Sequence, residues 1–323
     1  MTEVSAEFAH KHNQVRAILA EAGVDGVVLE SPTTLSWMLC GARTHISLAA
    51  PPIAKALVTA DSVTVFTTNN ESARLVAEEL PEGIEVVARP WFEALPALPG
   101  VSELLLGDQL RAARRSLLAP EVERYAALGA DVAAVLGDVA RTATPGDSEF
   151  SLAAAISAGI VRAGAEALVV LVAGAERIGH RHPLPTHAPI GRRAMLVACA
   201  RRHGLIANIT RWVRFGAPTF DEMDAEARIL EVEADAFEAL APGASLNEVY
   251  ATIRESYARQ GFDSDEWRNH HQGGAAGYAG RDPRFSQEND VIALDQAFAI
   301  NPSAPGVKVE DTVLLTASGI RVL

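Results

Sequence analysis

Two short stretches of similar sequence, Thr144-Pro145-Gly146-Asp147-Ser148 and Ala241-Pro242-Gly243-Ala244-Ser245, indicate the fold of this 323-residue chain. Each stands where one helical pattern ends and another begins, because Pro and Gly interrupt a helix. Asp147 or Ser148 is the predicted N-cap of the helix after the first stretch. The helix before the first stretch begins at Pro120, and the helix before the second covers residues 222–240. The sequence therefore predicts two similar units, each with a helix, a Pro-Gly-x-Ser turn and a second helix.

Each of these units is followed by sequence rich in strand-forming residues. Three strands are predicted after the first unit and two after the second, at residues 168–173, 194–200, 205–213, 291–300 and 307–315. The repeated order predicts a duplicated α+β domain with its cleft between the two halves.

The first ~110 residues differ, since short helices and strands alternate there. The predicted helices cover residues 8–22 and 70–80, and the predicted strands cover residues 26–30, 54–59, 62–67, 85–87 and 103–107. Such alternation is typical of a small α/β domain, and a chain of 323 residues is longer than one ordinary domain. We therefore expect two domains, at residues 1–110 and 111–323.

The composition limits the class of function. Hydrophobic residues make up 49% of the chain, so a large core is available, and the net charge of −13 without a long basic run disfavours nucleic acid and anionic membrane as partners. Cys40 and Cys199 are too few for a disulfide framework, and neither a signal peptide nor a run of ~20 apolar residues is visible. We expect a soluble, cytoplasmic protein.

Several common catalytic motifs are absent from the sequence. There is no phosphate-binding Gly-x-x-x-x-Gly-Lys loop, no Gly-x-Ser-x-Gly nucleophile elbow and no Cys-x-x-Cys pair. The polar residues with chemical potential lie in the second half instead, around His182, around His270-His271 and along the predicted strand with Glu310 and Asp311.

In chain order, these motifs resemble those of the creatinase/aminopeptidase P/prolidase family, peptidase M24. Residues 144–149 resemble its Pro-Gly-x-Thr/Ser-Glu helix start, and residues 198–211 resemble its Asp-x-Gly…Asp-Ile-Thr-Arg hairpin. His271 and Gly274 resemble its His-Gly-x-Gly turn, and residues 306–312 resemble its Gly-Val-Arg-Ile-Glu-Asp-Thr strand. The resemblance implies an α/β N-terminal domain followed by a pita-bread domain with duplicated halves, and a homodimer.

The metal-dependent members of that family hold two divalent ions with two Asp, one His and two Glu. The corresponding positions in this chain are Ala198, Asn208, His271, Asn301 and Glu310. Three of the five have no charge, whereas hard divalent ions are held largely by anionic oxygen. We therefore predict that the chain uses no metal and no other cofactor.

Creatinase resembles these peptidases in fold, yet it cleaves a C–N bond without a metal. The resemblance implies His182 as the acid/base, since an ordinary histidine titrates near pH 6.5, with His271 and Glu310 completing the catalytic set. Glu310 would hold a cationic group of the substrate. The predicted function is a metal-independent, creatinase-like hydrolase, or a lyase, acting on a C–N bond of a small zwitterionic molecule.

Four further residues are expected to bind this substrate: Asn208, Tyr278, Arg281 and Asn301. Arg281 would pair with a carboxylate through its planar fork of donors. Cys199 is expected in the core rather than in the site, because it neighbours Ala198 on a strand and should face the other side.

Two alternative functions remain at this point. One is an Xaa-Pro aminopeptidase or dipeptidase with a reduced metal site, which the neutral residues at positions 198, 208 and 301 disfavour. The other is a catalytically inactive pita-bread protein that binds a partner, which the retained histidines disfavour.

Overall fold

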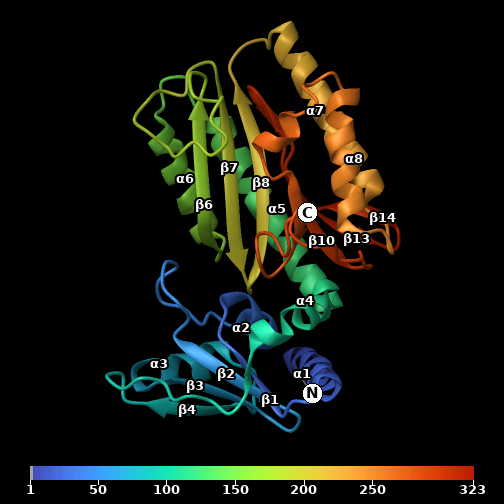
Figure 1. Cartoon of the computed structure of the whole chain (residues 1–323). Helices are drawn as coiled ribbons and strands as arrows, with labels where there is room; N and C mark the ends of the chain where they lie inside the picture. Colours follow the sequence, from blue (N-terminus) through green and yellow to red (C-terminus); the bar gives the residue numbers. More distant parts are fainter. Residues whose placement is uncertain (1–2) are drawn as a thin grey trace. The chain divides into compact units, whose positions relative to one another are not determined.

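The computed structural model describes residues 3–323, which form two compact units (Figure 1). One unit extends as far as Pro120 and includes His203–Leu205, and the other comprises Glu121–Arg202 and Ile206–Leu323. None of the described helices is long and apolar enough to cross a membrane.

The first unit is an α/β domain built on a five-stranded sheet in the order β4-β3-β2-β1-β5. The strands are β1 (Gly26–Leu29), β2 (Ala54–Thr59), β3 (Val63–Thr68), β4 (Glu85–Arg89) and β5 (Val101–Ser102). The helices are α1 (Glu3–Ala22), α2 (Pro32–Met38), α3 (Asn69–Arg74) with a π turn at Leu75–Glu79, a 3₁₀ turn at Glu103–Leu106, and α4 (Gly107–Arg115). The predicted alternation of helix and strand is confirmed.

Two local predictions in this unit were wrong because serine caps were overlooked. Residues 103–107 were predicted as a strand, but the Ser102 side chain accepts a hydrogen bond from the Leu104 amide and starts a helical turn. In the same way the Ser31 side chain accepts from the Thr34 amide, and Pro32 begins the unpredicted helix α2.

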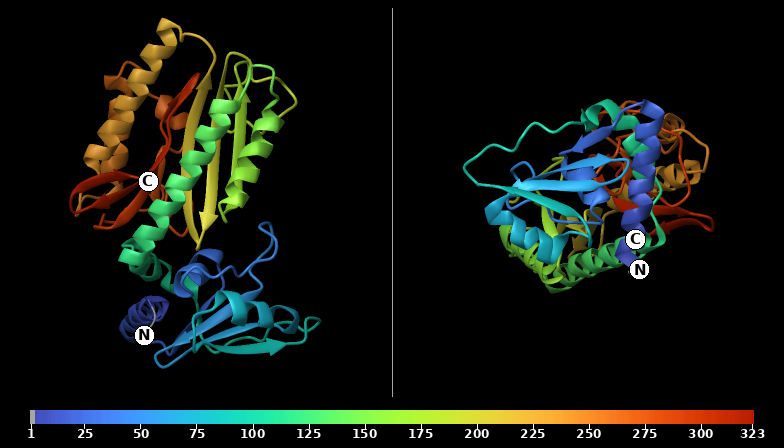
Figure 2. Two further views of the ribbon diagram at one scale, coloured as in Figure 1. Left: turned by 180° about the vertical axis from the view of Figure 1, so that it is seen from behind. Right: turned by 90° about the horizontal axis from the view of Figure 1, so that it is seen from below.

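The first half of the second unit is a three-stranded sheet, β6-β7-β8, with helices α5 and α6 against one face (Figure 2). Its elements are α5 (Ala119–Thr142), α6 (Glu149–Arg162), β6 (Glu166–Gly174), β7 (Arg193–Arg202) and β8 (Leu205–Arg214). The buried face of α5 comes from apolar residues at helical spacing, among them Tyr125, Leu128, Val132 and Leu136.

The second half repeats this order with shorter strands. Its elements are α7 (Phe220–Ala239), α8 (Leu246–Arg259), a 3₁₀ turn at Glu266–Asn269, β9 (Gly273–Ala276), β10 (Gln296–Ile300), β11 (Ser303–Ala304), β12 (Val307–Lys308), β13 (Asp311–Thr316) and β14 (Gly319–Val322). The main sheet has the order β14-β13-β10-β9, and one apolar cluster joins it to α7 and α8. The strand predicted at 291–300 begins only at Gln296, and β9 was not predicted as a strand.

The duplication is visible in the backbone contacts of the two Pro-Gly-x-Ser turns. In the first half Ser148 pairs with Pro189, and the Ile190 amide donates to the Asp147 carbonyl. In the second half Ser245 pairs with Val291, and the Ile292 amide donates to the Ala244 carbonyl. Each turn is thus held by a returning segment at the equivalent position, which confirms the duplicated α+β architecture.

Candidate active site

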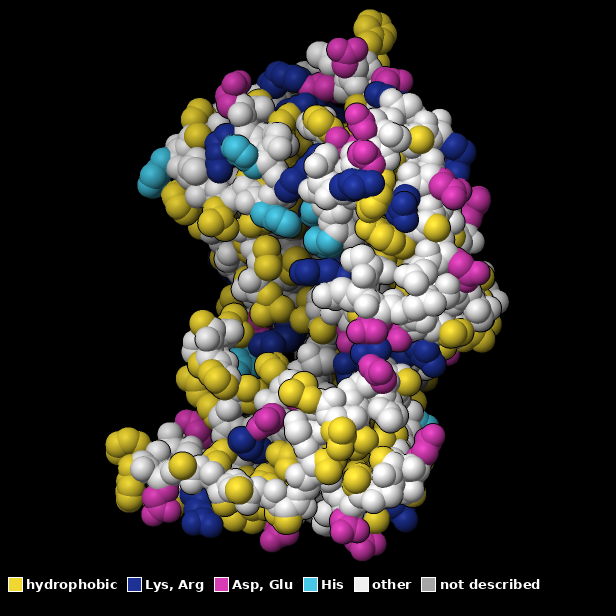
Figure 3. Space-filling view, viewed as in Figure 1, with side chains coloured by type: hydrophobic (Ala, Val, Ile, Leu, Met, Phe, Trp, Pro, Cys, Tyr) yellow, Lys and Arg dark blue, Asp and Glu magenta, His cyan; other side chains and the backbone are white. Residues whose placement is uncertain are grey.

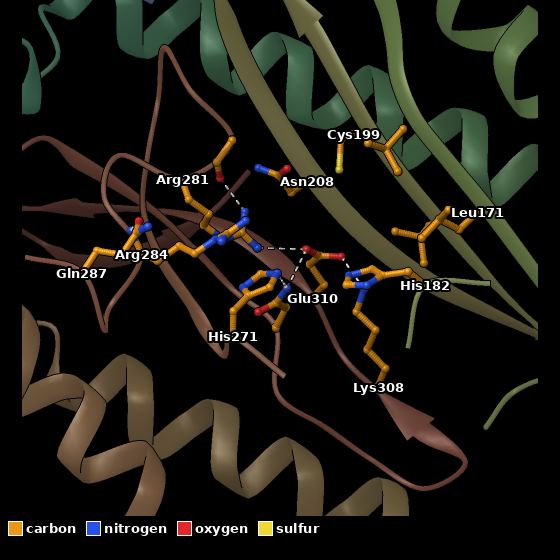
Figure 4. Close-up of a pocket in the computed structure, with 14 residues that line it drawn as sticks. Leu171, His182, Cys199, Asn208, His271, Arg281, Arg284, Gln287, Lys308 and Glu310 are labelled. Atoms are coloured by element: carbon orange, nitrogen blue, oxygen red, sulfur yellow. Dashed lines mark hydrogen bonds and ion pairs between the residues drawn. The ribbon is translucent and has the colours of Figure 1, made fainter. Parts of the chain in front are cut away.

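A cavity of about 500 Å³ lies between the two halves of the second unit (Figure 4). The first half contributes Val169, Leu171, His182, Val197, Cys199 and Asn208; the second contributes His271, Gly280, Arg281, Arg284, Gln287, Asn301, Lys308 and Glu310. On the face shown in Figure 3, histidine and arginine or lysine side chains gather near the middle of this unit. The cavity therefore brings together all the predicted site residues except Tyr278.

The Glu310 carboxylate is the centre of the polar side of the cavity and is only 4% exposed. Its Oε2 accepts from Lys308 Nζ and from Thr210 Oγ1, both at 2.9 Å. Its Oε1 accepts from Arg281 Nη2 at 3.0 Å and from Asn301 Nδ2 at 3.2 Å. Both carboxylate oxygens are thus already engaged within the protein.

These contacts keep Glu310 ionised. Burial alone would raise the pKa of Glu310, but the charges of Lys308 and Arg281, with hydrogen bonds from Lys308 and Thr210, hold it well below its usual range. Glu310 is therefore a permanent anion whose charge is balanced by two cations of the protein rather than left open for a ligand.

The family's metal-ligand set does not fit these residues. Besides Glu310, the cavity places the amides of Asn208 and Asn301 and the imidazole of His271 at the corresponding positions. Lys308 and Arg281 bring positive charge to the one remaining carboxylate, where a pair of divalent cations would need negative charge. The donor set is too poor in anionic oxygen for a two-metal centre.

The cavity-facing position on β7 differs by one residue from our prediction. Val197 and Cys199 line the cavity, whereas Ala198 is fully buried and is not part of the lining. Side chains alternate along a strand, so the predicted alternation was right but its register was one residue off. Val197 ligates a metal no better than Ala198, so the conclusion about charge is unchanged.

The prediction that Cys199 faces away from the site was therefore wrong, for the same reason of register. Burial raises the pKa of the Cys199 thiol to about 12, and the charge of Glu310 adds to this effect. A thiol that remains protonated at neutral pH is a poor nucleophile. Cys199 instead forms part of an apolar wall of the cavity, together with Val169, Leu171 and Val197.

Three histidines stand beside Glu310, on two separate segments. His182 lies in the loop between β6 and β7, and His270 and His271 lie just before β9. Burial lowers the pKa of all three: to about 4 for His270, with Lys308 adding to the effect, and to about 3 for His271, with Arg281 adding to it. The three imidazoles are therefore neutral at pH 7.

Two glycines allow the strand after these histidines, β9, to lie very close to neighbouring backbone. Gly273 and Gly274 have φ angles of +125° and +156°, and a Cβ on either residue would lie within 2.4 Å of a backbone carbonyl oxygen. A side chain would therefore clash at both positions. Glycine at these positions therefore lets β9 pair with β10 directly after His271.

Arg281 and Arg284 lie on the segment after β9, and their roles differ. Arg281 is committed to Glu310. Among the described residues, Arg284 makes no ion pair, although it lines the cavity and its side chain is exposed. The free guanidinium fork is thus Arg284, not Arg281 as the sequence led us to expect.

Tyr278 lies outside the cavity. It is 4% exposed, and its hydroxyl donates to Glu121 on α5. The structure therefore gives Tyr278 a role in joining α5 to the second half, and no contact with a substrate in this cavity.

Sequence reasoning missed Lys308, Arg284 and the apolar wall. The signal for Lys308 was available, because it stands two residues before Glu310 and side chains alternate along extended backbone. Arg284 had no such signal, since it follows a Pro in an irregular segment.

Comparison with known proteins places these observations in a family. The model of metallopeptidase family M24 matches residues 123–317. The probable dipeptidase PepE of Mycobacterium tuberculosis is 26% identical over 244 residues, which is 71% of this chain but only 63% of that protein.

Solved structures show the same fold over the whole chain. The dipeptidase PepE from Mycobacterium ulcerans matches with a TM-score of 0.80 at 21% identity, covering 98% of this chain and 95% of that one. The prolidase from Pyrococcus horikoshii matches with a TM-score of 0.79 at 21% identity, covering 97% of each chain. With the family match over more than half of its residues, the chain belongs to metallopeptidase family M24 and has the pita-bread fold.

Proposed function

We propose that this protein cleaves a C–N bond in a small molecule that carries a carboxylate, without the two-metal centre of its family. The observation that carries this proposal is the state of Glu310, the one carboxylate in the cavity lining. It is ion-paired to Lys308 and Arg281, while neutral amides line the same cavity at positions 208 and 301. The positive charge that balances Glu310 thus comes from the protein itself.

The charge of the cavity supports an anionic substrate. Its lining carries three cations, Arg281, Arg284 and Lys308, against the single anion Glu310, so its net charge is +2 with neutral histidines. A cavity with a net positive charge attracts ligands with a negative charge. The idea that Glu310 holds a cationic substrate group is abandoned, since both of its oxygens are occupied.

Arg284 is the residue that we assign to the substrate carboxylate. Its guanidinium is unpaired among the described residues and lines the cavity, and its planar fork matches a carboxylate with two parallel hydrogen bonds. This role was expected of Arg281, which is instead held by Glu310.

His182 is the residue that we assign to proton transfer. Burial and the charge of Lys308 lower the pKa of His182, so the neutral imidazole is ready to accept a proton at pH 7. In hydrolysis, water would add to the carbon of the C–N bond while His182 takes its proton. His182 would then return that proton to the leaving nitrogen as the C–N bond breaks.

A specific observation also favours a second candidate, an Xaa-Pro dipeptidase. The solved structures similar to this chain include a prolidase and a dipeptidase, and the first half supplies an apolar wall of Val169, Leu171 and Val197. Such a wall fits a proline ring, and the dipeptide carboxylate would bind Arg284 as above. This candidate requires a metal site rebuilt from other ligands.

Turnover of carboxylate-bearing amides, amidines, guanidino acids and Xaa-Pro dipeptides, assayed with and without chelator, tests the proposal. We expect one of the non-peptide classes to be cleaved in the presence of chelator. His182→Ala should reduce that turnover about 100-fold or more, the contribution typical of general acid/base catalysis. His180→Ala, an exposed histidine two residues away, is the matched control and should leave turnover unchanged.

Activity confined to Xaa-Pro dipeptides and restored by added Mn²⁺ or Co²⁺ would overturn the proposal in favour of the second candidate. Equal loss of activity in His180→Ala and His182→Ala would show that the loop, rather than the His182 imidazole, is what matters.

A further inference from the structure

Three histidines, His182, His270 and His271, lie close together at the cavity, although the proposed reaction uses only His182 for proton transfer. The ring centroid of His182 lies 5.3 Å from that of His270 and 6.3 Å from that of His271. The centroids of His270 and His271 lie 4.4 Å apart. One ring nitrogen from each of the three lies within 4.8 Å of the others. Two of these residues, His182 and His270, are not among the metal-ligand positions that the family resemblance implies.

His270 is oriented as a ligand is. Its Nδ1 lies 3.1 Å from the backbone carbonyl oxygen of Asn301. Because a carbonyl can only accept, Nδ1 must carry the proton and Nε2 must expose its lone pair. This Nε2 is buried and has no hydrogen-bond partner among the described residues, and His270 is only 8% exposed. Metal-binding histidines are usually fixed in this way, by donating the other ring N–H to a carbonyl or a carboxylate.

His271 and His182 also make no strong hydrogen bond through their ring nitrogens among the described residues. His271 Nδ1 is buried without a partner among the described residues, and its Nε2 lies 3.5 Å from Asn301 Nδ2, at the outer limit of a hydrogen bond. His182 is on an exposed loop and contacts the other two through its ring. Three neutral imidazoles therefore converge without strong hydrogen bonds among themselves.

We propose that His182, His270 and His271 together bind a single Zn²⁺ ion, at a site separate from the carboxylate positions of the family. Imidazole nitrogen suits zinc, whereas the family's carboxylate sites rely on oxygen. Three protein nitrogens leave a fourth position for water.

The geometry needs only a small adjustment. At Zn–N distances of about 2.0–2.1 Å, tetrahedral nitrogens lie about 3.4 Å apart. The ring nitrogens would therefore have to close by roughly an ångström from their present separation. His182 supplies this movement, because its loop is exposed while His270 is held by Asn301.

Nearby cations oppose the ion and set its affinity. Lys308 and Arg281 share the single anion Glu310, and Arg284 adds a third positive charge to the cavity lining, so the net charge of +2 weakens binding of a cation. We expect binding that is weaker than in structural zinc sites of proteins but specific for the three histidines.

One consequence rests on the proposed function. An ion that takes the lone pair of His182 stops this residue from accepting a proton, so Zn²⁺ would inhibit the metal-free reaction. The binding site itself does not depend on that function.

Equilibrium dialysis of the full chain against Zn²⁺, with metal measured by elemental analysis, tests the site. We expect one ion per chain, with affinity lowered at least about tenfold in His270→Ala and in His271→Ala, a loss of the size seen when support of a metal site is removed. His180→Ala, the matched control, should bind as the unchanged protein does. His270→Gln, which keeps a donor toward the Asn301 carbonyl, serves if His270→Ala does not fold.

X-ray absorption at the zinc edge gives the second readout. A first shell of three imidazole nitrogens supports the site, and a shell dominated by oxygen overturns it. Failure of the unchanged protein to retain Zn²⁺, or equal losses in His180→Ala and His270→Ala, would also overturn it. Neither readout uses turnover, and a gain of turnover on adding Zn²⁺ would overturn the metal-free function while leaving the site intact.

Discussion

The Pro-Gly-x-Ser turns of the two halves are held alike, but the halves place different chemistry in the cavity. From the first half, β7 and β8 present Val197, Cys199 and Asn208. The second half presents all the permanent charges, from Arg281 to Glu310. The two halves share a backbone arrangement but place very different charge in the cavity lining.

This asymmetry explains the state of Glu310. In a centre with carboxylates from both halves, divalent ions would balance Glu310 and its partners across the cavity. Here the first half offers no charge, so Glu310 is balanced by Lys308 and Arg281 from its own half. The charge of Glu310 is thus balanced within the second half alone.

The two halves also differ at an equivalent position of their first helices, α5 and α7. Glu233 on α7 stands twelve residues before the cap Ser245, and Leu136 on α5 stands twelve residues before the cap Ser148. Leu136 is fully buried, as expected of an apolar side chain. Glu233 is 4% exposed, and its Oε1 has no hydrogen-bond partner among the described residues. The second half has a buried acid where the first half has a leucine.

The largest expected effect comes from breaking the charge balance of the second half. Glu310→Gln would leave Lys308 and Arg281 buried without their anion, and removing one partner of a buried ion pair typically costs about 3–5 kcal/mol. The free energy of unfolding in urea should fall by about this amount. Glu288→Gln, an exposed acid of the same half, should change it little.

A loss below about 1 kcal/mol in Glu310→Gln would mean that the two cations are solvated and that the balance is not structural. The double variant Lys308→Met, Glu310→Gln should recover part of the loss, since it removes one of the unpaired charges together with the anion.

The next effect depends on pH. Burial raises the pKa of Glu233 to about 8, with a further rise from Asp311. The folded protein therefore binds this proton more tightly than the unfolded chain does, whose glutamates titrate near 4.5. The resulting stability is present below pH 4.5 and is lost as the pH rises through about 8, by an amount on the order of a few kcal/mol.

Glu233→Gln, which imitates the protonated acid, should remove this loss and stabilise the protein at pH 9 relative to the unchanged chain. Urea unfolding at pH 5, 7 and 9 measures the difference, with the exposed Glu238→Gln on the same helix as control. The same pH dependence in Glu233→Gln and in the unchanged protein would show that Glu233 does not cause it.

A smaller effect compares the two halves directly through their helix caps. The Ser148 and Ser245 side chains accept from the amides of Ser151 and Glu248, and loss of such a cap typically costs about 1 kcal/mol. Ser245→Ala should cost slightly more than Ser148→Ala, because the Glu248 side chain completes a capping box only in the second half. Thermal unfolding of both variants measures the two losses, and a clear reversal of their order would show that α6 and α8 are not capped as described.

Much of this architecture was predictable from sequence because the signals are local. The caps Ser148 and Ser245, the Pro-Gly breaks and the apolar stripe of α5 each depend on neighbours within one or two turns. The family resemblance also named the positions of His182, His271, Asn208, Asn301 and Glu310, all of which line the cavity.

The details that escaped prediction depend on contacts between distant residues. Arg281 and Arg284 are three residues apart, and only the fold shows that the first reaches Glu310 and the second does not. The register of β7 likewise follows from its pairing with β6, in which Val197 lies opposite Leu171. The meeting of His182 with His270 joins two loops that are far apart in the chain.

The smallest expected effect concerns Cys199 in the first half, which contributes no permanent charge to the cavity lining. Because burial raises the pKa of Cys199 to about 12, the thiol stays protonated at pH 8, and alkylation requires the thiolate. Iodoacetamide should therefore modify Cys199 far more slowly in the folded protein than in urea, as followed by mass spectrometry of the Cys199 peptide. Rapid labelling in the folded state would show that the surroundings of Cys199 on β7 are more polar than its neighbours imply. It would then contradict the contrast between an apolar first half and a charged second half.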